Sequence, residues 1–274
     1  EYYQTHNGLG CVDDCLVLPK FSDILKPEVQ KLLQKKRAIF IPHRSFEVYL
    51  NFDYEAIEKR FTVPIFGNKY LLKIEERGIK PNQYDLLKKA EIRYPQQFTD
   101  PQKIDRLCLV KVIEKKREFE RAFFLAESYQ DYKKQVDEKL KNGIFTREQL
   151  KAAVIEEFIV GVQVNLNFFY SPLSGELELL GTDTRRQTNI EGILKIPSLY
   201  QNKVIEKIAS KYEEAGHIAV TILESMIQQA YELGERFVKT SQRMFPPGII
   251  GPFALQTIII PCPPKKEFVV IYVS

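Results

Sequence analysis

The hydrophobic pattern of this chain changes twice along its length, and each change limits the kind of sheet that the residues can build. Short apolar runs alternate with helical stretches over residues 1–66, which is typical of parallel strands joined by helices. Two helix patterns, NKYLLKIEER and QYDLLKKAEI, dominate residues 67–106. From 107 to 274 the strands are long and alternate between apolar and polar residues, as antiparallel strands with one covered face do. The sequence therefore predicts an α/β (α+β) fold with a parallel layer, a helical connector and antiparallel sheets.

Helix signals place individual elements within these regions. Helices are expected at residues 54–60 and 128–142, and Thr146 opens another with a capping box. Residues 219–242 carry apolar side chains at helical spacing, which predicts an amphipathic core helix. The segment SLYQNKVIEK before it is expected to be a loop.

Composition limits the class of protein. The 274 residues are 44% hydrophobic and 28% charged, which is a globular profile. The net charge of +4 comes from 40 basic and 36 acidic residues, so a broad surface for nucleic acid is not expected. No apolar stretch approaches the length of a membrane span and no signal peptide is recognisable, so we expect a cytoplasmic protein without a membrane segment. Richness in Lys and Glu, with two Met and no Trp, fits a hyperthermophile.

Lys111 lies inside the apolar strand LCLVKV and is the first candidate for chemistry. The lysine is followed by a charged loop, VIEKKREFER, and then by a second strand. Several nucleotide sites bind a triphosphate with a strand lysine and a loop arranged in this way. The alternative interpretations are a lysine that extends from an edge strand into water and a solvated charged hairpin.

Glu156 and Glu157 interrupt the apolar strand VIEEFIV. Two adjacent carboxylates are costly there unless one is exposed and the other finds hydrogen-bond donors, which a ribose diol would supply. The alternative is an edge strand that leaves both charges in water.

Polar residues also gather at several other strand positions. Gln187 belongs to the cluster GTDTRRQTN after the strand ELELL, and Ser45 lies in the turn PHRSF. His217 in AGHIAV and Gln256 in FALQTIII are polar side chains among apolar ones and need partners if they are buried. Each of these positions also fits a surface turn or a satisfied core residue.

These segments, in this order, resemble the archaeal PurP family, formate-dependent ATP-grasp ligases that formylate AICAR ribonucleotide to FAICAR in purine (IMP) biosynthesis. The matching stretches lie between residues 40 and 257 and include PHRSF, VPIFGNKYLLKIEER, IEEFIVG, FFYSPLSGELELLGTD and PPGIIGPFALQ. The resemblance implies an ATP-grasp fold whose antiparallel sheets enclose ATP. Residues 1–66 would be a truncated N-terminal βα domain, 67–106 a helical connector, and 107–274 an ATP-grasp domain without its C-terminal end.

The resemblance also implies roles for single residues, although it assigns no catalytic residue. The implied AICAR contacts are Ser45 and His217; the implied ATP contacts are Lys111 for the phosphates, Glu156 and Glu157 for the adenosine, and Gln187; the implied Mg²⁺ ligand is Gln256. In the family's reaction formate attacks the γ-phosphate of ATP, and the AICAR amine captures the resulting formyl phosphate. The expected substrates are therefore ATP, formate and AICAR, the expected cofactors ATP and Mg²⁺, and the family suggests a homo-oligomer.

His217 stands where the family often has asparagine, and either residue can hydrogen-bond. The sequence departs from the family pattern in three respects. Tyr272 stands where the family has a metal-binding glutamate, VIEKKREFER replaces a glycine-rich phosphate loop, and the family's first βα unit and its C-terminal segment are expected to fall outside this chain. These departures keep a second hypothesis open, in which the chain is a diverged paralogue that binds nucleotide without catalysis or ligates another small carboxylate.

Overall fold

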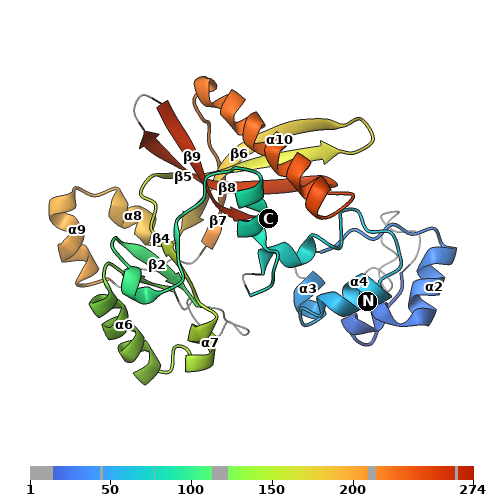
Figure 1. Cartoon of the computed structure of the whole chain (residues 1–274), viewed down its shortest axis with the longest axis horizontal. Helices are drawn as coiled ribbons and strands as arrows, with labels where there is room; N and C mark the ends of the chain where they lie inside the picture. Colours follow the sequence, from blue (N-terminus) through green and yellow to red (C-terminus); the bar gives the residue numbers. More distant parts are fainter. Residues whose placement is uncertain (1–14, 44–45, 77, 113–122, 209–213, 263–264) are drawn as a thin grey trace. The chain divides into compact units, whose positions relative to one another are not determined.

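A computed structural model describes residues 15–43, 46–76, 78–112, 123–208, 214–262 and 265–274 of the chain. The residues form two compact units, 1–73 and 74–274, which are coloured from blue to red along the sequence in Figure 1. Each unit is described by itself below.

The first unit packs short helices around an aromatic core. The rings of Phe40, Phe46 and Phe61 lie with centroids 5.0–5.5 Å apart. Phe40 forms an isolated parallel bridge with Ile65, so the two apolar runs that the sequence predicts as parallel strands meet in that orientation over a single pair. The helices are η1 (Phe21–Leu25), α2 (Pro27–Lys35), α3 (Phe46–Tyr49) and α4 (Tyr54–Arg60), and η2 (Leu72–Glu75) follows at the border of the units.

The second unit contains a small antiparallel sheet in the order β1-β4-β2-β3. Its strands are β1 (Gln97–Phe98), β2 (Cys108–Lys111), β3 (Phe123–Ala126) and β4 (Val154–Glu157). One face packs against α6 (Tyr129–Lys141) and α7 (Arg147–Lys151), with a buried core that includes Val110, Phe124 and Ile155. Ser128 and Thr146 cap these helices, and the capping box at Thr146 is confirmed.

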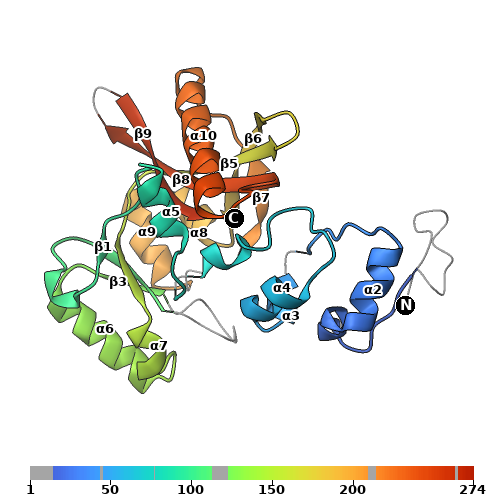
Figure 2. The same ribbon diagram turned by 45° about the vertical axis from the view of Figure 1, so that its right-hand side comes forward.

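A larger antiparallel sheet in the order β7-β6-β5-β8-β9 completes the second unit. Its strands are β5 (Val162–Ser171), β6 (Glu176–Gln187), β7 (Glu214–Ala219), β8 (Gly251–Cys262) and β9 (Lys265–Val273). The long helix α10 (Ile227–Met244) lies along one face, as Figure 2 shows. The remaining helices are α5 (Gln83–Lys89), η3 (Pro101–Lys103), α8 (Ile190–Leu194), α9 (Ser198–Ile205) and η4 (Glu224–Met226).

Strand alternation divides the larger sheet into an apolar and a polar face. Val164, Leu166 and Phe168 on β5 are buried, and Phe168 stacks with Phe253, which stacks in turn with Phe237 of α10. Successive side chains of a strand point to opposite faces, so Asn165 and Asn167 point away from α10. Helix α10 thus covers the apolar face, and the polar residues of the sheet share the other one.

Two predicted elements differ from the structure. The core helix predicted over residues 219–242 begins only at Ile227, and Ala219, its first predicted residue, ends β7, which pairs with β6. Sheet pairing accounts for Ala219, and η4 (Glu224–Met226) is a 3-10 turn that leads into α10. The segment SLYQNKVIEK is not a loop, since Ser198–Ile205 form α9. That helix has no buried residue, so it carries no apolar stripe by which the sequence could reveal it.

The pattern NKYLLKIEER is helical only in part. Of its described residues, Leu72–Glu75 form a 3-10 turn and the others lie outside helices, whereas QYDLLKKAEI contains the predicted helix α5.

Candidate functional site

The polar face of the larger sheet gathers side chains from all five strands. Asn165 of β5 lies opposite both Asp183 of β6 and Gln256 of β8. Gln256 in turn lies opposite Tyr272 of β9. Residues directly opposite each other on antiparallel strands point to the same face, so this register places the four side chains in one row. The row runs across the face that α10 does not cover.

Asp183 is the centre of the hydrogen-bond network on this face. Its Oδ1 accepts from Asn165 Nδ2 at 2.8 Å and its Oδ2 accepts from Asn167 Nδ2 at 2.5 Å. The Nδ1 atom of His217 lies 2.5 Å from Oδ1. Burial acts to raise the pKa of the Asp183 carboxyl, but the hydrogen bonds from His217, Asn167 and Asn165 outweigh burial and hold that pKa below its usual value. Asp183 is therefore a fixed carboxylate.

His217 of β7 lies between two carboxylates. Its Nδ1 faces Asp183, and its Nε2 lies 3.0 Å from Oε1 of Glu214 on the same strand. The hydrogen bond with Asp183 raises the pKa of His217 above its usual value, burial opposes the rise, and the bond with Glu214 adds to it. The side chain is 41% exposed, so the ring is also open to a ligand.

Arg185 links this network to Gln256. Its Nη2 donates to Gln256 Oε1 at 3.2 Å, and its Nε lies 3.6 Å from Glu214 Oε2. Asn165 Oδ1, next to Gln256, is buried and accepts no hydrogen bond within the described ranges. A buried oxygen without a donor is costly in the free protein and available to a cation.

Tyr272 donates its hydroxyl to Oε2 of Glu75 at 2.5 Å. The phenol therefore holds a carboxylate from η2 near the end of the polar row.

A second polar cluster is buried in the smaller sheet. Lys111 of β2 and Glu156 of β4 form an ion pair with side chains that are 8% and 3% exposed, and Tyr84 of α5 donates to Glu156 Oε2 at 2.9 Å. Strand β2 lies between β3 and β4, so the interpretation of Lys111 as an edge-strand lysine is wrong. The lysine is held by its partner and does not extend into water.

The two adjacent glutamates have different environments. Glu157 accepts from Gln96 N at 3.4 Å and lies 3.7 Å from an Nη of Arg106, while Glu156 is buried. The alternative with both charges in water is therefore wrong. The donors that Glu156 needs come from Lys111 and Tyr84.

The other predicted residues fall at the margins or outside the described ranges. Gln187 ends β6, and its backbone N–H donates to Glu191 Oε1 at 2.8 Å. Ser45 lies outside the described residues, as do residues 113–121 of the predicted loop VIEKKREFER. The predicted site residues of the second unit thus form two groups, Lys111, Glu156 and Glu157 on the smaller sheet and His217, Gln187 and Gln256 on the larger one.

Sequence reasoning missed several members of these groups. Asn165 and Asn167 stand at alternate positions of an apolar strand, and this spacing could have identified them as one polar face. No comparable signal marks Tyr84, Glu75 or Glu214 in the sequence. Each is part of the site only through a hydrogen-bond partner, which is Glu156, Tyr272 and His217, respectively.

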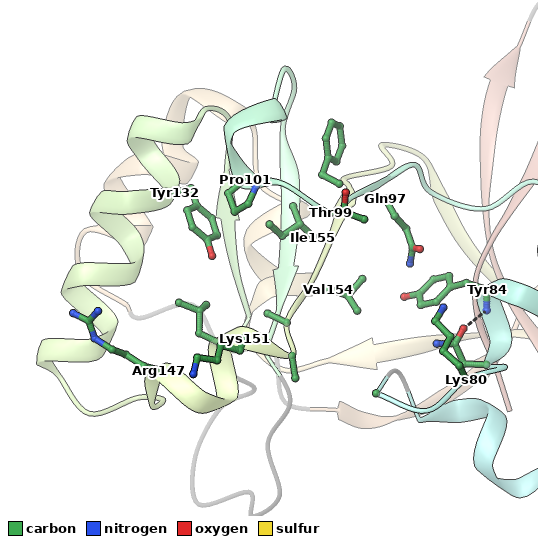
Figure 3. A pocket seen from close by; sticks show the side chains of 16 residues that line it. Lys80, Tyr84, Gln97, Thr99, Pro101, Tyr132, Arg147, Lys151, Val154 and Ile155 are labelled. Carbon is green, nitrogen blue, oxygen red and sulfur yellow. Dashed lines mark hydrogen bonds between the residues drawn. The ribbon is translucent and has the colours of Figure 1, made fainter.

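A cavity of about 710 Å³ opens beside β1 and β4 (Figure 3). Tyr84 and Val154 line it on one side, and Tyr132 of α6 and Arg147 of α7 on the other. Neither Lys111 nor the polar row of the larger sheet lines this cavity. We place the candidate site at the two polar clusters, because they contain the groups that can bind charge and move protons.

None of the described helices is long and apolar enough to cross a membrane. In the same residues no three His, Cys, Asp or Glu side chains form a group that could hold a metal ion.

Comparison with known proteins gives consistent matches along the chain. Residues 131–274 match the model "Domain of unknown function (DUF1297)", and residues 1–98 match "Protein of unknown function (DUF1246)". The chain is 36% identical over 263 residues to the 5-formaminoimidazole-4-carboxamide-1-(beta)-D-ribofuranosyl 5'-monophosphate synthetase of Methanocaldococcus jannaschii, covering 96% of this chain and 70% of the relative. The synthetase of the same name from Methanopyrus kandleri is 35% identical over 270 residues, covering 98% and 72%.

Solved structures agree with this picture. The IMP biosynthesis protein PurP from Thermococcus kodakaraensis superposes with a TM-score of 0.63 at 29% identity, covering 99% of this chain and 73% of that one. The ADP complex of N5-carboxyaminoimidazole ribonucleotide synthetase gives a TM-score of 0.59 at 12% identity, covering 94% of this chain and 58% of that one. At that identity the second likeness shows the fold alone.

Proposed function

The chain belongs to the PurP family of archaeal FAICAR synthetases, which has the ATP-grasp fold, and we propose that it is an ATP-dependent ligase that formylates AICAR to FAICAR with formate. The observation that carries this proposal is the 36% identity to a curated synthetase over 96% of the chain. The matched region includes both polar clusters, Lys111 with Glu156 and the row around Asp183.

The reaction has two steps. A formate oxygen attacks the γ-phosphorus of ATP, which releases ADP and leaves formyl phosphate. The 5-amino group of AICAR then attacks the formyl carbon, the C–O bond to phosphate breaks, and FAICAR and inorganic phosphate form. Phosphoryl transfer depends chiefly on positioned charges, so the protein needs cations near the phosphates and a shielded place for the intermediate.

We assign the ATP contacts to the smaller sheet and to the end of β6 in the larger sheet. In this proposal Lys111 holds ATP phosphates, Glu156 and Glu157 lie at the adenosine, and Gln187 contacts ATP. Glu156 also has a second role in this proposal, because its buried ion pair with Lys111 fixes the position of the lysine ammonium group within the sheet. Tyr84, which donates to the same carboxylate, supports that position.

The side chains of Gln256 and Asn165 supply only neutral amide oxygens, so a Mg²⁺ ion bound there would need ATP for its charged ligands. Mg²⁺ prefers oxygen ligands. The buried Asn165 Oδ1 accepts no hydrogen bond in the described part, and the neighbouring Gln256 Oε1, which accepts from Arg185 Nη2 at 3.2 Å, would have to exchange that donor for the ion. In this proposal Gln256 and Asn165 hold the ion. When bound, Mg²⁺ neutralises negative charge on the phosphates.

We assign contacts with AICAR to His217 and to Ser45. The exposed imidazole of His217 is accessible to such a ligand. A homo-oligomer is also part of the proposal, and sedimentation velocity of the purified protein measures it.

The direct test mixes the protein with ATP, Mg²⁺, formate and AICAR and follows ADP and FAICAR. Both products are expected, each dependent on formate. ADP release that continues without formate, or no FAICAR with the full-length protein, would overturn the proposal.

A second candidate function rests on Tyr272. A phenol is a poor Mg²⁺ ligand, and this one is hydrogen-bonded to Glu75, which fits a paralogue that binds nucleotide without turnover. Calorimetry separates the two functions. Nucleotide binding that is indifferent to Mg²⁺, with no ADP release dependent on formate, supports the paralogue, and Mg²⁺-dependent ATP binding contradicts it.

A further inference from the structure

The cavity of about 710 Å³ in the second unit opens where the edge of the smaller sheet loses its pairing. Strand β1 pairs with β4 through only two residue pairs, the second of which joins Phe98 to Ile155. The pairing ends there, and the next residues along the two segments, Thr99 and Val154, both line the cavity. Its volume lies within the range of roughly 300–1,000 Å³ that is usual for small-molecule sites. The space is therefore large enough for an organic ligand.

The charged side chains in the lining are of one sign. Lys80, Arg147 and Lys151 line the cavity, and among the described residues no Asp or Glu does so. Lys80 pairs with Asp85 at 3.2 Å and Lys151 with Glu148 at 2.9 Å, and both carboxylates lie outside the lining. Arg147 makes no ion pair with another residue that the structure describes. A recess lined by charges of one sign attracts ligands of the opposite sign, so this cavity favours an anion.

Two of these cations stand together, and aromatic rings accompany them. Arg147 and Lys151 are the first and last residues of α7 and lie one turn apart, so both side chains are at the α7 end of the cavity (Figure 3). Guanidinium and ammonium groups are the side chains that bind phosphate. The rings of Tyr84 and Tyr132 and the apolar side chain of Val154 also line the space. The lining thus fits a ligand that has both a phosphate group and a planar apolar ring.

Strand alternation separates this cavity from the proposed ATP contacts. Val154 lies opposite Lys111, so its side chain shares the face of the sheet that carries Lys111. The next residue, Ile155, belongs to the buried core on the other face, where Tyr132 of α6 packs. Val154, Ile155 and Tyr132 all line the cavity, so the space extends around the edge of the sheet toward α6 and α7. A ligand held by α7 can therefore bind while ATP occupies the face of Lys111.

We propose that this cavity is a second ligand site, which binds a nucleoside monophosphate separately from ATP. Arg147 and Lys151 hold the phosphate, and the base lies beside Tyr84 and Tyr132. The site does not depend on the reaction proposed above. It adjoins the proposed ATP contacts through Tyr84, whose hydroxyl donates to Glu156 at 2.9 Å.

Calorimetry with AMP as the probe tests the site. The protein is first saturated with AICAR, Mg²⁺ and a non-hydrolysable ATP analogue, so that AMP cannot occupy the places assigned to these molecules. One AMP per chain is expected to bind. Arg147→Gln/Lys151→Gln should weaken that binding about 10-fold or more, because charge-assisted hydrogen bonds to the phosphate are lost. Lys134→Gln/Lys141→Gln removes two exposed charges from α6 and is the matched control, with unchanged affinity.

Three results of the calorimetry would overturn the proposal. They are no AMP binding to the saturated protein, an unchanged affinity in Arg147→Gln/Lys151→Gln, and inorganic phosphate that binds as tightly as AMP. The last result would mean that the aromatic rings contribute nothing to recognition.

Fluorescence locates the bound AMP without any use of turnover. The sequence contains no Trp, so Tyr132→Trp gives the protein a single indole group, which lies in the cavity lining. AMP should change its emission over the same concentrations that calorimetry gives. Tyr200→Trp, at an exposed position of α9, is the control and should show no change. An indole at position 132 that does not respond to AMP would overturn the site even if AMP binds elsewhere. A protein that forms no FAICAR would overturn the proposed function and leave this test valid.

Discussion

Lys111 on β2 and Glu156 on β4 form an ion pair inside the smaller sheet, where the two residues are only 6% and 3% exposed. Burial of two opposite charges is tolerated when geometry and extra hydrogen bonds compensate for lost hydration, and Tyr84 supplies one such bond. The pair therefore has two effects. It contributes to the stability of the sheet, and it positions the Lys111 ammonium group that we propose to contact the phosphates of ATP.

Removing one member of this pair should destabilise the fold. Lys111→Met leaves the Glu156 carboxylate buried without its counter-charge, which is expected to cost about 3–5 kcal/mol in the free energy of unfolding. The double variant Lys111→Met/Glu156→Leu should recover most of that loss and still fail to bind ATP. Urea unfolding and calorimetry measure the two effects. The exposed Lys151→Met is the control, with a change of about 0–1 kcal/mol. Equal stability of the single and double variants would contradict this account.

Tyr84→Phe tests the hydrogen bond to Glu156. The bond joins residues 72 positions apart and ends on a buried carboxylate, so its loss should lower the free energy of unfolding by about 1.5–3 kcal/mol. Tyr94→Phe removes a hydroxyl from the neighbouring ring, whose centroid is 5.9 Å away, and serves as the control. If both variants unfold at the same urea concentration as the wild type, the hydroxyl of Tyr84 does not support the pair.

Gly161 marks a close approach of two strands at the start of β5. A Cβ atom at this position would lie 2.3 Å from the carbonyl oxygen of Ile259, a backbone atom that cannot turn away. Gly161→Ala should therefore lower the free energy of unfolding by about 1–3 kcal/mol. Gly192→Ala is the matched control, because nothing lies within 4 Å of its Cβ, and thermal unfolding should show no loss there.

The pair of His217 and Asp183 predicts a dependence of stability on pH. The pKa of His217 is raised above 6.5 in the folded protein, so its contribution is fully present below 6.5 and is lost as pH rises through the folded pKa. Asp183 has a lowered pKa, so its contribution is present above 3.8 and is lost as pH falls through the folded pKa. Urea unfolding of wild type and His217→Asn at pH 5.5 and 8.5 should give a larger difference at the lower pH. A larger difference at pH 8.5 would contradict the raised pKa.

Local patterns in the sequence predicted the parts of the fold that depend on neighbouring residues. The capping box at Thr146 and the helix α4 follow from signals within a few positions, and both are confirmed. The alternation along β5 also predicted an antiparallel strand with one covered face. By contrast, AGHIAV forms β7 because of pairing with β6, which no local pattern encodes.

The candidate site shows the same division. Lys111, His217 and Gln256 were identified as polar residues among apolar ones, a signal that each carries in its own segment. Their partners were not identified, because Tyr84 meets Glu156 and Arg185 meets Gln256 only through the folded sheets. Sequence reasoning thus located chemical groups, and the register of the strands determined which of them act together.

The central claim is that formate is activated as formyl phosphate before the AICAR amine reacts. Formate labelled with ¹⁸O, incubated with the protein, ATP, Mg²⁺ and AICAR, tests it directly by mass spectrometry of the inorganic phosphate. The account predicts one ¹⁸O atom in each phosphate formed, because the formate oxygen that attacks the γ-phosphorus leaves with the phosphate. Unlabelled phosphate formed together with FAICAR would contradict it.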